Sequence, residues 1–191
     1  MPDGRRLVLV VGASGVGKDS VLDGARAVFR DDPRIVFVQR VITRPAGSGG
    51  EDSIAATPEE FAALCARQAF AIHWPAHGLA YGLPRRMDDD LGQGRVVVAN
   101  VSRQVLDDAR RRYHGLTVCE VTASIDTLRA RLTARGRESP AEIGARLARV
   151  GTPTVGHDVV TIANDGDLAD AVAAFARLIG QLLPVSAKPL A

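Results

Sequence analysis

The sequence predicts a three-layer α/β fold, in which helices cover a mostly parallel β-sheet. Three observations carry this prediction. The apolar residues 7–11 form a buried-strand pattern that leads through a glycine-rich turn into a helix pattern at 20–29. A second valine-rich run at 95–100 predicts another buried strand. Strand and helix patterns alternate through the rest of the chain, which is typical of parallel strands joined by helical crossovers.

The turn after the first strand holds the most specific motif of the chain. Glycines there let the backbone turn tightly and bring successive N–H groups onto phosphate oxygens, while the helix N-terminus adds partial positive charge. Lys18 is expected to reach the β- and γ-phosphates as a point charge. Because the turn lies between a strand and a helix, it predicts an ATP-binding phosphate loop. Its residues are Gly12, Ala13, Ser14, Gly15, Val16, Gly17, Lys18, Asp19 and Ser20.

One position of this loop departs from the usual pattern. Asp19 stands where a serine or threonine hydroxyl usually meets Mg²⁺. A carboxylate is also a hard oxygen ligand, so either Asp19 or the next hydroxyl, Ser20, is expected to support the metal. The valine-rich strand ends in Asn100, an amide, which weakens any case for direct metal ligation from that strand.

Composition excludes several classes of function. At 191 residues, with 46% hydrophobic and 24% charged residues, the chain has the size and composition of one globular domain. A net charge of +2 and 4% aromatic residues argue against a nucleic-acid or membrane-binding surface. The two cysteines, Cys65 and Cys119, lack metal-binding spacing. With no signal peptide or membrane span in the sequence, a cytoplasmic location is expected.

The remaining elements follow from periodicity and capping signals. Thr57, Pro58 and Glu60 predict a capped helix start, and Ser102 is expected to cap another helix. The arginines at 110–112 are expected to form a solvated helix end. Residues 77–82 predict a tight turn, and the residues after 183 a frayed tail. Further strands are expected at 35–42, 70–74, 116–121 and 159–163, and helices at 57–67, 86–91, 102–112, 126–134, from 139, and 168–183.

The whole pattern resembles the guanylate kinase branch of phosphate-loop proteins, and within it the ribose 1,5-bisphosphate phosphokinase family. The resemblance covers nearly the whole chain. Its motifs, specific when taken together, are Gly17-Lys18-Asp19-Ser20, Ile42-Thr43-Arg44-Pro45-Ala46, Gly49-Gly50-Glu51, His77-Gly78-Leu79 with Tyr81-Gly82, Asn100-Val101-Ser102-Arg103, and Arg135-Gly136-Arg137-Glu138.

The resemblance implies an organisation and a set of roles. It implies one kinase domain over 1–185, with an acceptor-binding insertion at about 43–90, a lid at about 131–150 and a tail at 186–191. Arg131, Arg135 and Arg146 would be catalytic lid contacts to the phosphates, and Asn164 would lie near the adenine. Arg44, Glu51, His73, Tyr81 and Asn100 would bind the acceptor.

Two departures from guanylate kinases bear on the acceptor. His73 stands before Trp74 where those enzymes carry a glutamate that binds guanine, and Asn100 stands where they carry an acid. A pocket that loses its acceptor atom leaves a substrate N–H unpaired, so loss of guanine recognition is expected. His73 itself is either a packed strand residue or a substrate contact. The glycine-rich stretch at 46–52 is likewise either a linker or a substrate loop.

These features predict an ATP-dependent kinase that, with Mg²⁺, converts ribose 1,5-bisphosphate to 5-phosphoribosyl 1-diphosphate in phosphonate degradation. Transfer onto a phosphate, already anionic, requires cations rather than a general base. The partners would be ATP and a small phosphorylated sugar, with no nucleic acid or membrane, and the protein a monomer or homodimer. The alternatives are a guanylate-kinase-like nucleotide kinase and a non-catalytic binding module. The intact Gly17-Lys18 pair argues against the module.

Overall fold

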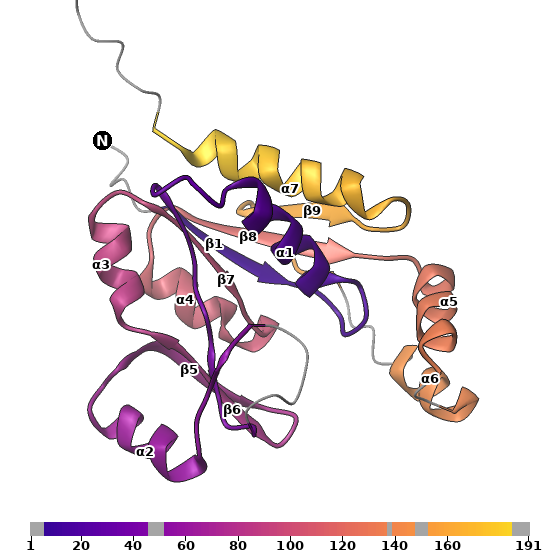
Figure 1. The fold of residues 1–191 in the computed structure, drawn as a ribbon, viewed down its shortest axis with the longest axis horizontal. Helices are drawn as coiled ribbons and strands as arrows, with labels where there is room; N and C mark the ends of the chain where they lie inside the picture. Colours follow the sequence, from indigo (N-terminus) through magenta and orange to yellow (C-terminus); the bar gives the residue numbers. More distant parts are fainter. Residues whose placement is uncertain (1–5, 46–51, 137–138, 148–152, 185–191) are drawn as a thin grey trace, which may run out of the picture.

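The computed structural model describes residues 6–45, 52–136, 139–147 and 153–184. At its centre lies a five-stranded, fully parallel sheet in the order β2-β7-β1-β8-β9 (Figure 1). The strands are β1 (Arg6–Val11), β2 (Ile35–Phe37), β7 (Val96–Asn100), β8 (Leu116–Thr122) and β9 (Val159–Ala163). Parallel strands with both faces covered carry continuous apolar runs, which is why β1 and β7 were recognisable from sequence.

Helices cover both faces of this sheet, which confirms the three-layer prediction. One face packs against α1 (Lys18–Val28) and α7 (Leu168–Leu182), the other against α3 (Arg86–Gly92) and α4 (Leu106–Arg112) (Figure 1). Alternate side chains of β1 point into the cores on the two faces of the sheet. Val8 and Val10 lie with Phe175 of α7, whereas Leu7 and Leu9 belong to the core on the other side.

A second sheet projects from the α3–α4 side and was only partly predicted. It has the order β4-β3-β6-β5 and consists of β3 (Val41–Ile42), β4 (Ile54–Ala55), β5 (Phe70–Ala76) and β6 (Leu79–Pro84). The single strand expected over 35–42 is therefore wrong: its first part joins the parallel sheet, and its last two residues pair antiparallel with β6. The turn expected over 77–82 is also mostly strand, because the reversal needs only His77 and Gly78, both at positive φ.

Helix α2 (Pro58–Ala66) covers one face of this second sheet. The predicted capping box is confirmed: Glu60 N–H donates to Thr57 Oγ1 at 3.1 Å, and Thr57 N–H donates to Glu60 Oε2 at 2.8 Å. Phe61 of α2 stacks on Phe70 of β5 with ring centroids 4.7 Å apart. These contacts fix α2 on the outer side of the second sheet.

Helices α5 (Ile125–Arg135) and α6 (Pro140–Leu147) lie together on the side toward which β1 and β8 point (Figure 1). The helix expected from Ser102 begins instead as a 3₁₀ turn, η1 (Arg103–Val105), and the Ser102 side chain makes no capping hydrogen bond. The glycine-rich stretch 46–51 and the tail at 185–191 lie outside the described residues.

Both cysteines, Cys65 and Cys119, are free. Within the described ranges, no helix has the length and apolar character needed to cross a membrane.

Candidate functional site

The predicted phosphate loop connects β1 to α1 at the carboxyl edge of the parallel sheet. Two of its glycines lie where no other residue fits. Gly12 has φ +149°, and a Cβ there would lie 2.3 Å from Val121 O. Gly17 has φ +90°, and its Cβ would lie 2.4 Å from Nδ2 of Asn164. The loop backbone is therefore pressed against β8 on one side and the end of β9 on the other.

Lys18 is the first residue of α1 and lies over the loop. Its Nζ donates to Gly12 O at 2.9 Å and to Ala13 O at 3.2 Å, and the side chain is half-buried. The ammonium group is thus held among the loop carbonyls, beside the N-terminus of α1. A phosphate group bound there would meet a fixed cation together with the helix N–H groups.

Two predicted residues from distant parts of the chain reach this loop. Asn164, which follows β9 and is 2% exposed, donates through Nδ2 to Val16 O at 2.7 Å. Arg131 of α5 places Nη1 3.5 Å from the same oxygen. The structure therefore brings Asn164 against the loop backbone, where it holds Val16. Oδ1 of Asn164 is buried, with no hydrogen-bond partner among the described residues.

The neighbouring Asp165 fixes the start of α5. Its Oδ1 accepts a hydrogen bond from the Ser124 backbone N–H at 2.6 Å. Hydrogen bonds from the backbone and hydroxyl of Ser124 hold the pKa of Asp165 below its usual value. The carboxylate thus stays ionised and ties the residues after β9 to α5, the helix that carries Arg131.

The predicted metal-binding residues follow Lys18 in the chain. Asp19 and Ser20 are both exposed in the first turn of α1. Asn100, at the carboxyl end of β7 and 7% exposed, directs Nδ2 to Asp19 Oδ1 at 3.3 Å. The loop therefore supplies the carboxylate of Asp19, and strand β7 supplies the neutral amide of Asn100 as its partner. Both residues line a hollow with Asp23, Arg26 and Asp52.

The predicted acceptor residues are divided between the two faces of the second sheet. Tyr81 stacks on Trp74 with centroids 5.5 Å apart, on the face toward the main core. His73 is exposed on the opposite face, where its ring lies 6.2 Å from that of Phe70. The structure therefore brings Tyr81 toward the parallel sheet and does not bring His73 with it.

Arg44 lies two residues after the end of β3 and is half-buried. Its Nη2 lies 2.7 Å from Ser53 Oγ. It lines a pocket together with Thr43, Pro45 and the start of α2. Glu51 lies outside the described residues, as do the side chains of Arg135 and Arg146, so the predicted roles of these three stay predictions.

Sequence analysis missed a buried ionic cluster that consists of Glu120, Arg103 and Thr154. Glu120 of β8 is 1% exposed, accepts from Arg103 Nη2 at 2.7 Å, and also accepts from the backbone N–H and hydroxyl of Thr154. Arg103 follows β7, and Thr154 belongs to the segment that leads from α6 back to β9. A lone acid within the apolar strand pattern at 116–121 was the available signal, because a buried carboxylate needs partners.

The arginines at 110–112 correct another expectation. Arg110 forms a two-pronged ion pair with Asp158 at 2.9 Å, which holds the pKa of that carboxyl below its usual value. Arg112 bonds Asp88 of α3 and Ala71 O of β5. Arg111 and Arg112 are nevertheless exposed in the last turn of α4, as expected of a solvated helix end. The cluster joins α4 to its neighbours because its cations face acids on other elements.

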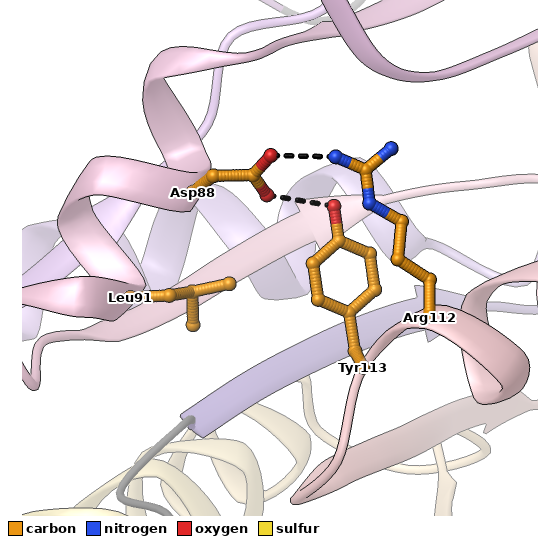
Figure 2. Close-up of a pocket in the computed structure, with 4 residues that line it drawn as sticks. All are labelled: Asp88, Leu91, Arg112 and Tyr113. Atoms are coloured by element: carbon orange, nitrogen blue, oxygen red, sulfur yellow. Dashed lines mark hydrogen bonds and ion pairs between the residues drawn. The ribbon is translucent and has the colours of Figure 1, made fainter.

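Figure 2 shows the pocket between α3 and α4 in which Arg112 takes part. Asp88 accepts from Arg112 Nη2 at 2.6 Å and from the Tyr113 hydroxyl at 2.8 Å, beside Leu91. Both carboxylate oxygens are engaged, and none of the lining residues belongs to the phosphate loop. The arrangement fastens α3 to α4.

Comparisons with known proteins agree with this geometry. The chain is 52% identical over 162 residues to the ribose 1,5-bisphosphate phosphokinase PhnN of Rhodopseudomonas palustris, covering 85% of this chain and 81% of the relative. It is 48% identical to the protein of the same name from Brucella melitensis, covering 88% of each. The guanylate kinase of Anaplasma phagocytophilum superposes with a TM-score of 0.65 at 20% identity, over 95% of this chain and 87% of that one. No protein-family model matches the chain.

Proposed function

Since the chain belongs to the ribose 1,5-bisphosphate phosphokinase family, we propose that it transfers the γ-phosphoryl group of ATP to ribose 1,5-bisphosphate. The products would be ADP and 5-phosphoribosyl 1-diphosphate, and the reaction would belong to phosphonate metabolism, as the sequence predicts. The observation that supports the proposal most directly is the phosphate loop. Lys18 lies over it, and Asn164 and Arg131 both contact Val16 O.

The reaction needs positioning and charge rather than a base. An oxygen of the sugar 1-phosphate attacks the γ-phosphorus, and the bond from that phosphorus to the β–γ bridging oxygen breaks. The attacking oxygen is already anionic, so no proton has to be removed. Lys18 and Arg131 supply cations on the ATP side, while Arg44 and Tyr81 are proposed to hold the acceptor. Asn164 is proposed to keep the loop in its binding conformation.

The residues present fit a Mg²⁺ ion carried mainly by the nucleotide. Asp19 and Ser20 are oxygen ligands in the first turn of α1, and Asn100 holds the Asp19 carboxylate from β7. Among the described residues, no group of three or more histidine, cysteine or acidic side chains is placed to hold a metal. Mg²⁺ commonly keeps several waters and binds one or two protein oxygens plus substrate phosphates. When bound, it would neutralise charge on the phosphates.

Helices α5 and α6 are proposed to form the lid. Arg131 already contacts the loop, and α5 runs through Arg135 before Gly136 ends it in a left-handed conformation. The roles of Arg135 and Arg146 as further phosphate contacts remain part of this proposal. A cytoplasmic location, a monomeric or homodimeric state, and the absence of nucleic-acid and membrane partners stay predictions from the sequence.

A coupled assay of ADP release tests the proposed function. With ATP and Mg²⁺, ribose 1,5-bisphosphate is expected to support turnover, and phosphorus NMR is expected to detect the new diphosphate. GMP is expected to be a much poorer acceptor. Lys18→Ala serves as the control for contaminating kinases. Equal or faster turnover with GMP would refute the assignment in favour of a nucleotide kinase, and no ATP-dependent thermal shift would favour a binding module.

A further inference from the structure

Arg40 lies over the aromatic pair in the second sheet. Its guanidinium carbon is 4.9 Å from the centroid of the Tyr81 ring and 5.9 Å from that of Trp74. The two rings are nearly parallel, with an interplanar angle of 10°. Trp74 is 3% exposed, while Arg40 and Tyr81 are half-buried. The guanidinium is therefore held in place by two rings at the edge of the core.

Arg40, Trp74 and Tyr81 lie on the face of the second sheet that is turned toward the parallel sheet. Val41 packs with Phe61 and Phe70 on the α2 side, and neighbouring residues of an extended chain point to opposite faces. Arg40 accordingly lies on the other face, with Trp74 and Tyr81. These rings belong to, or pack against, the core that contains Val101, the residue after Asn100.

A side-chain contact fixes the sheet in this position. Gln104 of η1 donates through Nε2 to Pro75 O at 2.6 Å, next to Trp74 in β5. The turn η1 begins three residues after Asn100, where β7 ends. The rings and Arg40 are thus anchored to the same chain segment that places Asn100 beside Asp19.

Arg40 and Arg44 flank β3, one before it and one after it. Over residues 39–84 the chain has one further arginine, Arg67, and no lysine. Arg67 is exposed at the end of α2, which covers the other face of the sheet. Arg40 stacks on the rings, and Arg44 lies beyond the other end of β3 with its Nη2 2.7 Å from Ser53 Oγ, so the chain presents one cation before β3 and one after it.

We propose that Arg40 binds the second phosphate of the acceptor, the one that does not receive the phosphoryl group, and thereby selects a sugar bisphosphate. This inference rests on the proposed function and on the proposed contact of Arg44 with the other phosphate. A guanidinium that stacks on an aromatic face directs its N–H groups outward in the guanidinium plane. Two of these N–H groups can then donate to two oxygens of one phosphate.

The same arrangement disfavours a nucleotide as acceptor. A base bound in this part of the site would stack on an aromatic face. Here the faces of Trp74 and Tyr81 are occupied by each other and by Arg40. The site therefore offers an anion-binding edge in the place where a base would need a flat apolar surface.

Acceptors that each lack one phosphate test this assignment. Arg40→Gln is expected to lower kcat/KM for ribose 1,5-bisphosphate about 100-fold, the effect of losing two charge-assisted hydrogen bonds. Its kcat/KM for ribose 1-phosphate, which lacks the second phosphate, is expected to stay within about threefold of wild type. Arg67→Gln is the matched control and should change neither value. Equal losses on both acceptors, or no loss on either, would overturn the inference.

Inhibition by ribose 5-phosphate gives a second measurement that needs no turnover of a poor acceptor. This compound carries only the second phosphate and should compete with ribose 1,5-bisphosphate. Arg40→Lys keeps the positive charge but loses the planar pair of N–H donors, and it is expected to weaken this inhibition about tenfold. Unchanged inhibition would overturn the assignment. A wild-type protein that does not phosphorylate ribose 1,5-bisphosphate would refute the proposed function, and this inference with it.

Discussion

Replacing Gly17 by alanine is expected to disrupt the phosphate loop through two separable costs. Gly17 has φ +90°, and a residue with a Cβ pays about 1–2 kcal/mol in the left-handed region. The new Cβ would also lie 2.4 Å from Asn164 Nδ2, so that amide must move. Its 2.7 Å hydrogen bond to Val16 O would then be lost in a buried place, at about 1–3 kcal/mol.

Gly94 provides the matched control for the first cost alone. It has φ +76°, and a Cβ there would meet nothing within 4 Å. Gly94→Ala should therefore lower the free energy of unfolding by about 1–2 kcal/mol. Gly17→Ala should lower it by about 2–5 kcal/mol, the sum of both costs.

Urea unfolding at constant temperature measures these differences, and ATP-induced thermal shifts report on the loop. Gly17→Ala should lose the ATP-dependent shift, while Gly94→Ala should keep it. Equal destabilisation by the two variants would refute the role of the Asn164 contact. A wild-type ATP shift in Gly17→Ala would show that the loop does not need the observed backbone conformation.

Three further predictions concern charges of the site and its frame. Lys18→Ala should lower turnover about 100-fold or more in the ADP-release assay without changing the urea midpoint substantially. Glu120→Gln, which removes the negative charge that Arg103 contacts in this buried cluster, should lower the free energy of unfolding by about 2–3 kcal/mol in the same urea experiment. Arg110 lowers the pKa of Asp158 in the folded protein. The pair therefore stabilises the fold at pH values above the pKa that this carboxyl has in the unfolded chain, and this stabilisation is lost as the pH falls through the lower pKa of the folded state. Thermal melts at decreasing pH should therefore show less acid sensitivity in Arg110→Gln than in wild type.

The parallel sheet and its helices were predictable because each element carries its own local signal. β1 and β7 are continuous apolar runs, and the loop between β1 and α1 is specified by residue types at fixed spacing. The capping box at Thr57 and Glu60 is equally local, and the structure confirms it. Such features depend on neighbours within a few residues, so a single sequence is enough to find them.

The second sheet was less predictable because pairing partners are not local. Nothing in the β-rich run 35–42 shows that Val38 bonds to Val98 O while Val41 and Ile42 pair with β6. Strict alternation along β5 would place Phe70 and Trp74 on one face. An irregularity between Phe70 and Ile72 shifts the register, so His73 joins Phe70 instead. The irregularity thus places His73, a candidate substrate residue, on the face that carries Phe70 and not on the face that carries Trp74.

The two halves of the site are determined in different ways. The proposed ATP half is built from backbone contacts that converge on Val16 and Gly17, so its shape depends on glycines and on one amide. The proposed acceptor half consists of side chains on the second sheet, which contacts the rest of the chain through interactions such as the exposed ion pair of Arg26 with Asp52. Substitutions in the second sheet are therefore expected to alter the proposed acceptor surface without disturbing the loop. A fold shared with a guanylate kinase thus leaves the acceptor undecided, and the proposed contacts of the side chains around β3 would decide it.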